Sequence, residues 1–288
     1  APIRPANPRD PADLAYHWGA IDKVVREASE YGVGLAALIQ HAPGWANGAR
    51  AAIWAPTSPQ TFADFAFAAS RRYPSIKRWM IWGEPSREEN FRPMDSRRPT
   101  GTRIYAGILD ASYAALKQAS PSNIVIGGMT LNGGTVMPPQ FLRWMKLPNG
   151  RPPRMDLWGD NPFDARFPRL ADKPLGQFRG FNDVDTLYAE IKDAYRAGHR
   201  KVPKLWLSEW TIVSDRPLQL FSGFFVSRRE QAIRLKAAYQ IARQTSYVSG
   251  LGWFTLQDQA VDEGAAGWGL MQADGKPKPA FQAYELVP

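Results

Sequence analysis

Short apolar runs alternate with longer stretches of helical spacing along nearly the whole chain. Apolar runs of strand length lie at residues 34–42, 78–84, 123–130, 155–161, 204–211 and 250–257. They are mostly apolar rather than strictly alternating, which is typical of parallel strands covered on both faces. Helical spacing of apolar residues occurs at 21–31, 61–73, 102–119, 184–197 and 228–246. Strands interleaved with helices in this way predict an α/β fold with a parallel sheet.

The first and last of these helices show the helical spacing clearly. In the first, the apolar positions that recur are Ile21, Val24, Val25 and Ala28. Gly32 follows this helix as a C-terminal stop. In the last, the apolar positions that fall on one face are Ile233, Ala237, Ala238 and Ile241. Both patterns are typical of a helix with one apolar face.

Polar and aromatic side chains repeatedly fall at the C-terminal ends of the predicted strands. They are His41, Trp45, Glu84, Thr130, Asn132, Asp160, Asn161, Glu209, Trp210, Gln257 and Asp258. A closed barrel brings the ends of all its strands to one mouth, whereas an open sheet binds ligands at one switch point. The chain has no Gly-x-Gly-x-x-Gly turn and no phosphate loop. The pattern therefore favours a (β/α)8 TIM barrel over an open sheet.

The number of predicted strands is smaller than a closed (β/α)8 barrel contains. Residues 1–19 are rich in Pro, Arg and Asp and predict a loop, so we expect the first one or two strands to be absent from this chain. No long Gly/Ser-rich linker, internal repeat or low-complexity tract divides the sequence. We therefore predict a single catalytic barrel domain over residues 1–288, with a loop-like N-terminal segment at residues 1–19.

Composition narrows the classes of protein. The chain has 288 residues and a net charge of +9, with basic residues dense between positions 143 and 179. A positive charge of this size is explained either by binding of an anionic polymer or by an ordinary basic surface. The sequence contains no nucleic-acid-binding module, so no nucleic-acid partner is predicted. No apolar run is long enough to span a bilayer. The absence of cysteine excludes disulfides, thiolate metal sites and a cysteine nucleophile.

The start of the chain bears on where the protein is located. It shows no basic stretch followed by an apolar one, so we expect any signal peptide to be absent from this chain. We predict a secreted or periplasmic bacterial protein, and a cytoplasmic location stays open. The sequence does not predict an oligomeric state.

Two glutamates stand at the ends of apolar strands beside tryptophan. Glu84 follows Trp82-Gly83, and Glu209 precedes Trp210. A carboxylate at the tip of a buried strand is costly unless it is paired, hydrogen-bonded or used in chemistry. Two carboxylates across a barrel mouth match the acid and the nucleophile of a glycoside hydrolase. The alternative is a structural role, in which Glu84 pairs with Arg78 or caps a loop amide and Glu209 binds an arginine of a neighbouring strand.

Other side chains near strand ends are candidate substrate contacts. Tryptophan stacks on the apolar faces of sugar rings, and the candidates are Trp45, Trp82, Trp158, Trp210 and Trp253. The alternative for each tryptophan is burial in the core. The candidates for binding sugar hydroxyl groups are His41, Asn132, Asn161, Gln257 and Asp258. For Gln257 and Asp258, a hydrogen bond that closes a loop is the alternative. The histidines lack metal-ligand spacing, and neither a metal nor an organic cofactor is predicted.

Several motifs occur in a characteristic order and spacing. They are Ala42-Pro43-Gly44-Trp45-Ala46, Ile81-Trp82-Gly83-Glu84-Pro85, Ile126-Gly127-Gly128, Leu207-Ser208-Glu209-Trp210-Thr211, Gly252-Trp253-Phe254, Gly269-Leu270-Met271 and Lys276-Pro277-Lys278-Pro279-Ala280-Phe281. Together they resemble glycoside hydrolases of clan A, the retaining (β/α)8 enzymes, and most of all the family 39 β-xylosidase and α-L-iduronidase group. The resemblance implies that Glu84 ends the fourth strand as acid/base and that Glu209 ends the seventh as nucleophile. It also implies that the first two strands are the missing ones.

The sequence departs from this family pattern at two places. The family usually has Asn before the acid/base, where this chain has Gly83. The sixth strand commonly ends His-Pro-Tyr, where this chain has Asn161-Pro162-Phe163. The missing amide and hydroxyl each donate hydrogen bonds to the reacting centre, so their loss is expected to weaken catalysis or to change the accepted sugar.

The resemblance implies an O-glycosidase that cleaves with retention. Glu209 attacks the anomeric carbon, and Glu84 protonates the departing oxygen and then activates water. The predicted partner is a carbohydrate, either an oligosaccharide or a polysaccharide. Acidic carbohydrates are among the candidates. The alternatives are a non-catalytic glycan-binding barrel and a basic protein that binds an anionic polysaccharide.

Overall fold

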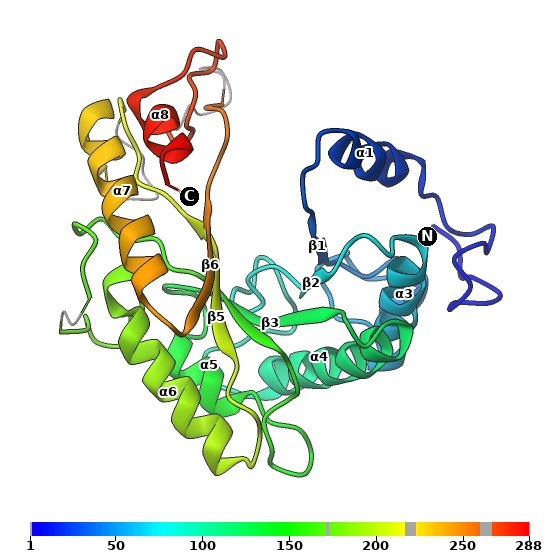
Figure 1. Ribbon diagram of the computed structural model, residues 1–288. Helices are drawn as coiled ribbons and strands as arrows, with labels where there is room; N and C mark the ends of the chain where they lie inside the picture. The colour runs from blue at the N-terminus through cyan, green and yellow to red at the C-terminus, as the bar shows by residue number, and fades with distance from the viewer. Residues whose placement is uncertain (1, 171–172, 217–222, 260–266, 288) are drawn as a thin grey trace. The chain divides into compact units, whose positions relative to one another are not determined.

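The computed structural model describes residues 2–170, 173–216, 223–259 and 267–287 (Figure 1). Its strands are β1 (Ala36–Ile39), β2 (Arg78–Ile81), β3 (Ile124–Leu131), β4 (Leu157–Asn161), β5 (Lys204–Trp210) and β6 (Val248–Trp253). They follow one another in chain order in the sheet, and β1–β2, β2–β3 and β5–β6 pair in parallel. The parallel sheet therefore confirms the predicted α/β class.

Helices connect the strands. They are α1 (Gly19–Glu30), α2 (Gly44–Asn47), α3 (Pro59–Arg72), α4 (Thr100–Ala119), α5 (Pro138–Trp144), η1 (Phe181–Asp183), α6 (Val184–Ala197), α7 (Arg228–Gln244) and α8 (Pro279–Glu285). The five predicted helices correspond to α1, α3, α4, α6 and α7. The pattern missed α2, α5, η1 and α8, which are too short to show a helical period. None of the described helices combines the length and apolar character needed to cross a membrane.

The chain forms two compact units, which are described separately. The first unit comprises Ala1–Thr130, Gly134–Gly159 and Ile191–Pro203. The second comprises Leu131–Gly133, Asp160–Glu190 and Lys204–Pro288. Two expectations from the sequence stay predictions. One is a single barrel domain over residues 1–288, and the other is closure into a (β/α)8 barrel with one or two additional strands.

In the first unit, α3 packs against α4 beside the strands. The buried positions of α4 recur at helical spacing and include Tyr105, Ile108, Leu109 and Leu116. The Tyr105 hydroxyl donates a hydrogen bond of 2.9 Å to the carbonyl oxygen of Ile81. This bond ties α4 to the last residue of β2, so the helix fixes the point at which the chain leaves the strand.

The N-terminal segment forms no helix or strand over residues 2–18, in agreement with the predicted loop. It is held by aromatic contacts, because the Tyr16 and Trp18 rings lie 5.7 and 5.6 Å from the Phe65 ring of α3. The following helix α1 has no buried residue, and Ile21 and Val24 on its predicted apolar face are 48% and 51% exposed. The spacing therefore predicted the helix correctly, while its apolar face stays largely uncovered by the described residues.

Gly128 in β3 allows a close contact in the core of the first unit. Its φ is +77°, and a Cβ built there would lie 2.7 Å from the buried Trp158 ring. We expect Gly128→Ala to lower the free energy of unfolding by about 2 kcal/mol or more, because strain and overpacking add. Urea denaturation followed by tryptophan fluorescence measures this loss.

Gly150 provides a matched control for that substitution. Its φ is +76°, but no atom lies within 4 Å of a Cβ built there. Gly150→Ala therefore introduces the backbone strain without the collision and is expected to cost about 1–2 kcal/mol. If both variants lose the same free energy of unfolding, the collision with the Trp158 ring does not contribute to the cost of a side chain at Gly128.

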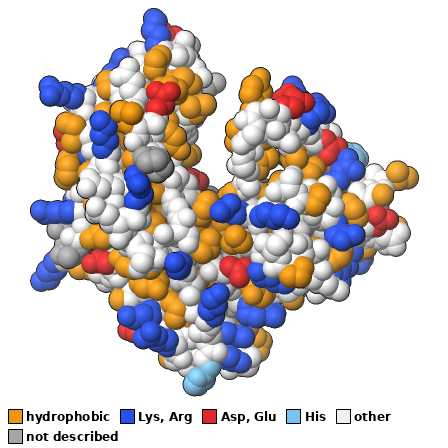
Figure 2. All heavy atoms as spheres, viewed as in Figure 1, with side chains coloured by type: hydrophobic (Ala, Val, Ile, Leu, Met, Phe, Trp, Pro, Cys, Tyr) orange, Lys and Arg blue, Asp and Glu red, His pale blue; other side chains and the backbone are white. Residues whose placement is uncertain are grey.

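In the second unit, α7 packs on β6 and on α8. A cluster of buried apolar side chains holds these elements together and consists of Leu235, Leu270, Ala280 and Ala283. The side chain of Lys278, which immediately precedes α8, is also fully buried. Figure 2 shows Lys and Arg side chains spread over the visible surface rather than gathered in one patch.

Candidate active site

Glu84 lies just beyond β2, where the backbone leaves the extended conformation. Trp82 and Glu84 have φ of 63° and 46°, both in the left-handed region that non-glycine residues rarely adopt. The Trp82 amide still donates to the carbonyl oxygen of Ile39 in β1, at 2.8 Å. Conformations of this kind persist where the surrounding structure holds them, and they cluster at functional sites. Glu84 is thus presented by a turn that the sheet itself positions.

Two side chains hold the Glu84 carboxylate. Arg87 Nη1 donates a hydrogen bond of 2.8 Å to Oε2, and Asn90 Nδ2 donates one of 3.2 Å to the same oxygen. The Glu84 side chain is 14% exposed. The structure thus contains an ion pair of the kind considered as the alternative for Glu84, and it shows Arg87 as the partner. Two hydrogen-bond donors fix the orientation of the carboxylate, as a catalytic group requires.

Trp82 supports this turn from within the core. Its ring is fully buried, stacked on Phe62 at 5.6 Å and set edge-on to Phe91 at 4.8 Å. Its Nε1 donates to the carbonyl oxygen of Asn90 at 2.8 Å. Asn90 therefore joins the buried Trp82 ring to the Glu84 carboxylate. A side chain without exposed surface offers no face to a sugar, so in this structure Trp82 orients Glu84 instead.

Trp158 is also buried in the first unit. Its side chain has no exposed surface, and Nε1 donates to Thr130 Oγ1 at 3.2 Å. The close approach of Gly128 covers the ring on another side. For Trp158, burial in the core is therefore what the structure shows.

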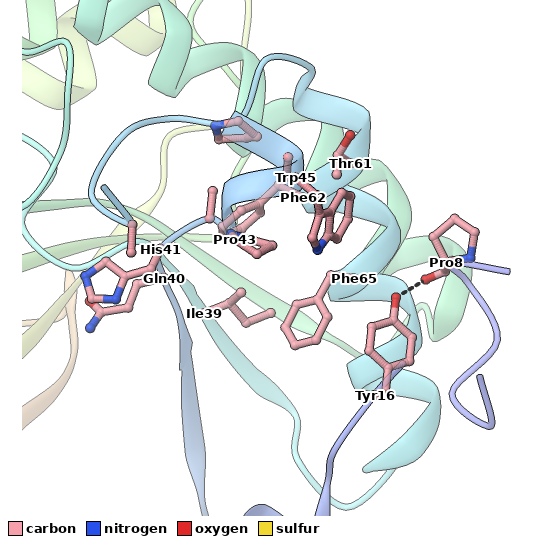
Figure 3. A pocket seen from close by; sticks show the side chains of 14 residues that line it. Pro8, Tyr16, Ile39, Gln40, His41, Pro43, Trp45, Thr61, Phe62 and Phe65 are labelled. Carbon is pink, nitrogen blue, oxygen red and sulfur yellow. Dashed lines mark hydrogen bonds between the residues drawn. The ribbon is translucent and has the colours of Figure 1, made fainter. Parts of the chain in front are cut away.

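Trp45 and His41 differ from these tryptophans because both line a cavity in the first unit (Figure 3). The cavity has a volume of about 330 Å³ and lies at the end of β1, beside α2 and the start of α3. His41 is exposed and Trp45 is half-buried. The His41 ring stands edge-on to Trp82, with centroids 6.2 Å apart. These two predicted contacts are therefore open to a ligand.

Glu209 lies in β5 of the second unit, one residue before the strand ends. The pairing of β5 with β6 shifts here, since Leu207 pairs with Leu251 and Trp210 with Trp253. Two residues of β5, Ser208 and Glu209, therefore lie opposite one residue of β6, which is a β-bulge. Bulges redirect side chains and are common beside active sites. Glu209 is half-buried.

The tryptophans beside Glu209 form a packed aromatic group. Trp210 is 1% exposed and lies 5.1 Å from Phe181 and 5.5 Å from Trp253. Trp253 is half-buried, and its Nε1 donates to the carbonyl oxygen of Trp268 at 3.0 Å. Of the two, only Trp253 keeps surface that a ligand can reach.

Asn161 and Asn132 belong to the same unit as Glu209. Asn161 is buried at the end of β4, and its Oδ1 accepts a hydrogen bond of 2.8 Å from Ser208 Oγ, next to Glu209. Asn132 donates from its side chain to the carbonyl oxygen of Phe163. Asn161 thus joins the end of β4 to β5, and Asn132 holds the loop that follows β4. The Phe163 ring packs 6.0 Å from the Phe254 ring, an apolar contact where the family pattern has a tyrosine hydroxyl.

Gln257 and Asp258 close loops. Gln257 Nε2 donates to the carbonyl oxygen of Ala273 at 2.7 Å. Asp258 accepts from the Gly269 amide at 2.7 Å and pairs with the buried Lys278 Nζ at 2.7 Å. The alternative considered for these two residues, a loop-closing hydrogen bond, is therefore what the structure contains. The pairing of Lys278 with Asp258 could not be predicted from the sequence, because the two residues lie far apart along the chain.

Arginines in the basic region are engaged within the second unit. Arg166 donates to Asp164 at 2.8 Å and to Asp183 at 2.7 Å. Arg179 is 6% exposed and donates to Glu190 at 2.6 Å. These ion pairs neutralise the positive charges of two arginines in the region that was considered for binding an anionic polymer. Among the described residues, no group of three His, Asp or Glu side chains is placed to hold a metal ion.

Comparison with known proteins gives likeness at the level of structure. No family model and no curated protein matches the chain. A glucosidase from Croceicoccus marinus is 19% identical with a TM-score of 0.66, and the match covers 98% of this chain and 54% of that structure. A monomeric β-xylosidase from Caulobacter crescentus is 17% identical with a TM-score of 0.63, covering 94% and 56%.

A family 39 glycoside hydrolase from the gut symbiont Bacteroides cellulosilyticus is 18% identical with a TM-score of 0.62, covering 93% of this chain and 53% of that structure. This chain thus spans about half the length of the structures it matches. At these identities the likeness shows the fold. The resemblance to family 39 enzymes that the motifs indicated is therefore confirmed for the fold.

Proposed function

We propose that this chain carries the catalytic residues of a retaining glycoside hydrolase. The observation that supports this most is Glu84, a carboxylate on a strained turn after β2 that Arg87 and Asn90 hold in one orientation. Glu209 stands in a bulge at the end of β5 and supplies the second carboxylate that the reaction needs. The fold is shared with a glucosidase and a β-xylosidase, which supports a glycoside as the substrate class.

In the proposed reaction, Glu209 attacks the anomeric carbon while Glu84 protonates the oxygen of the leaving group. The glycosyl–enzyme bond is then broken by water, from which Glu84 removes a proton. Arg87 and Asn90 keep the Glu84 carboxylate aligned through both steps, because both donate to the same oxygen. The retaining course requires the two carboxyl groups to stand about 5–5.5 Å apart during the reaction.

A panel of chromogenic glycosides and polysaccharides tests this proposal. We expect the purified protein to hydrolyse at least one member, with the product's anomeric configuration, followed by proton NMR, the same as that of the substrate. An inverted product would contradict the retaining mechanism. Absence of turnover across the panel with a folded protein would contradict the proposed hydrolase.

A second candidate is a glycan-binding protein without catalytic activity. Phe163 favours it, because its ring packs against Phe254 where a tyrosine would place a hydroxyl group near the nucleophile. Binding of a polysaccharide without turnover, unchanged in Glu209→Gln, would support this candidate. A third candidate, a protein that binds anionic polymer by charge, predicts binding that falls steeply as salt concentration rises.

A further inference from the structure

The cavity at the end of β1 has the composition of a small-molecule site. Most of its wall is apolar and comes from Ile39, Trp45, Phe62 and Phe65, with the Tyr16 ring closing one end (Figure 3). Figure 3 shows Gln40 and His41 at the opposite end. Sites for small ligands combine apolar walls with a few polar groups that orient the ligand.

The polar groups of the cavity differ in their availability. The Tyr16 hydroxyl donates to the carbonyl oxygen of Pro8 at 2.5 Å, and burial raises the pKa of Tyr16 to about 12, so this hydroxyl stays a neutral structural donor. Gln40 and His41 are exposed, and their side chains make no hydrogen bond within the described part of the chain. Thr61 near the start of α3 adds one hydroxyl group to the lining, so the cavity offers few hydrogen-bonding groups within a mostly apolar wall.

This distribution favours an aromatic ligand over a sugar ring. A sugar has hydroxyl groups on most of its edge, and those facing Ile39, Phe62 and Phe65 would lose their hydrogen bonds to water without replacement. An aromatic ring stacks on or packs edge-on to aromatic walls and gains from burial. A single oxygen on that ring would meet Gln40 or His41.

The cavity also adjoins the turn that carries Glu84. A Cβ built on Gly83 would lie 2.8 Å from Gln40 Oε1, so the Gln40 side chain fills the space that Gly83 leaves open. Ile39 and Ile81, the last residues of β1 and β2, are paired in register. An acid/base residue must reach the oxygen between the sugar and the leaving group. The leaving group is therefore expected beside this turn, which Gln40 adjoins at Gly83.

We propose that this cavity binds the leaving group of the glycoside, and that this group is an aromatic alcohol. The inference rests on the proposed function for the identity of the leaving group. The ring lies among Trp45, Phe62 and Phe65, and its oxygen is directed toward Gln40 and the turn at Gly83. Glycosides of aromatic alcohols are accordingly the preferred substrate class.

Two neighbouring alanines allow a matched test. Ala52 lines the cavity and is exposed, whereas Ala51 is exposed and outside the lining. Ala52→Phe places a ring at the cavity without repacking the core, and Ala51→Phe adds the same ring next to it. With 4-nitrophenol as the probe in isothermal titration calorimetry, we expect Ala52→Phe to weaken binding about tenfold or more, because the added ring occupies part of the space that the ligand needs. Ala51→Phe is expected to bind as the wild type does.

Kinetics separate this inference from the proposed function. We expect Ala52→Phe to lower kcat/KM for a 4-nitrophenyl glycoside much more than for the methyl glycoside of the same sugar. If glycosides are hydrolysed but Ala52→Phe changes neither 4-nitrophenol binding nor this ratio, the cavity inference is wrong and the proposed function stands. If 4-nitrophenol binds in the cavity and no glycoside is hydrolysed, the proposed function fails while the site for an aromatic alcohol remains.

Discussion

Replacement of Glu209 by glutamine is expected to abolish hydrolysis of every glycoside that the wild-type protein cleaves. Glutamine keeps the size of the side chain but lacks the carboxylate oxygen that attacks the anomeric carbon. The leaving group does not alter this outcome, because no glycosyl–enzyme bond can form from the amide. Product release from chromogenic glycosides, measured at high enzyme concentration, checks the result.

Glu84→Gln is expected to show a different dependence on the leaving group. Removal of general acid catalysis costs about 10²–10⁴-fold for a substrate whose leaving oxygen needs a proton. A 2,4-dinitrophenyl glycoside needs little protonation, so its first step should be nearly unaffected. This contrast with Glu209→Gln assigns the two roles, and equal losses with both leaving groups would contradict the role of Glu84.

Exposed glutamates provide controls for both substitutions. Glu88 lies four residues beyond Glu84, is 45% exposed and pairs with Arg92, and Glu285 is an exposed residue of α8 in the unit that contains Glu209. Glu88→Gln and Glu285→Gln should retain wild-type kcat/KM. Unchanged circular dichroism in all four variants would show that lost activity does not come from lost folding. Full activity in Glu84→Gln and Glu209→Gln would exclude both as catalytic residues.

The sequence predicted the elements well and their ends less well. The strand predicted at 78–84 ends at Ile81, because Trp82 and Glu84 turn into the left-handed region. Likewise, the strand predicted at 34–42 ends at Ile39, and His41 has φ of 69°. Apolar runs report burial rather than backbone angles, so they continue past the residue where a strand stops. The positions of Glu84 and Glu209 near strand ends were nevertheless predicted correctly.

Partners of individual side chains were the least predictable feature. Arg78 begins β2 and Glu84 lies three residues beyond the end of this strand, so the extended strand separates the two side chains. Arg87 can reach Glu84 because the intervening turn folds back. Tryptophans in similar sequence positions also differ, since Trp82 is buried and Trp45 lines a cavity. Which face of a turn a side chain occupies depends on its tertiary neighbours.

Lys278→Met is expected to destabilise the protein by about 3–5 kcal/mol, because it leaves a partly buried carboxylate without its cation. Lys278 Nζ is fully buried, 2.7 Å from Asp258 and 3.7 Å from Asp215. It also donates to Ser214 Oγ at 3.2 Å. Methionine fills a similar volume, so the loss of stability comes from the missing positive charge rather than from a cavity. Urea denaturation followed by tryptophan fluorescence measures the change in the free energy of unfolding.

Lys276 and Asp258 separate the contribution of the buried pair from other effects. Lys276 is 75% exposed and lies 2.7 Å from Asp274, so Lys276→Met should cost at most about 1 kcal/mol. Adding Asp258→Asn to Lys278→Met removes the unpaired charge and should recover much of the lost stability, because the remaining groups are neutral. If Lys278→Met is no more harmful than Lys276→Met, the pair does not hold the Asp258 loop against α8. Recovery in the double variant would instead establish Asp258 as a structural residue and exclude it from the sugar-binding contacts.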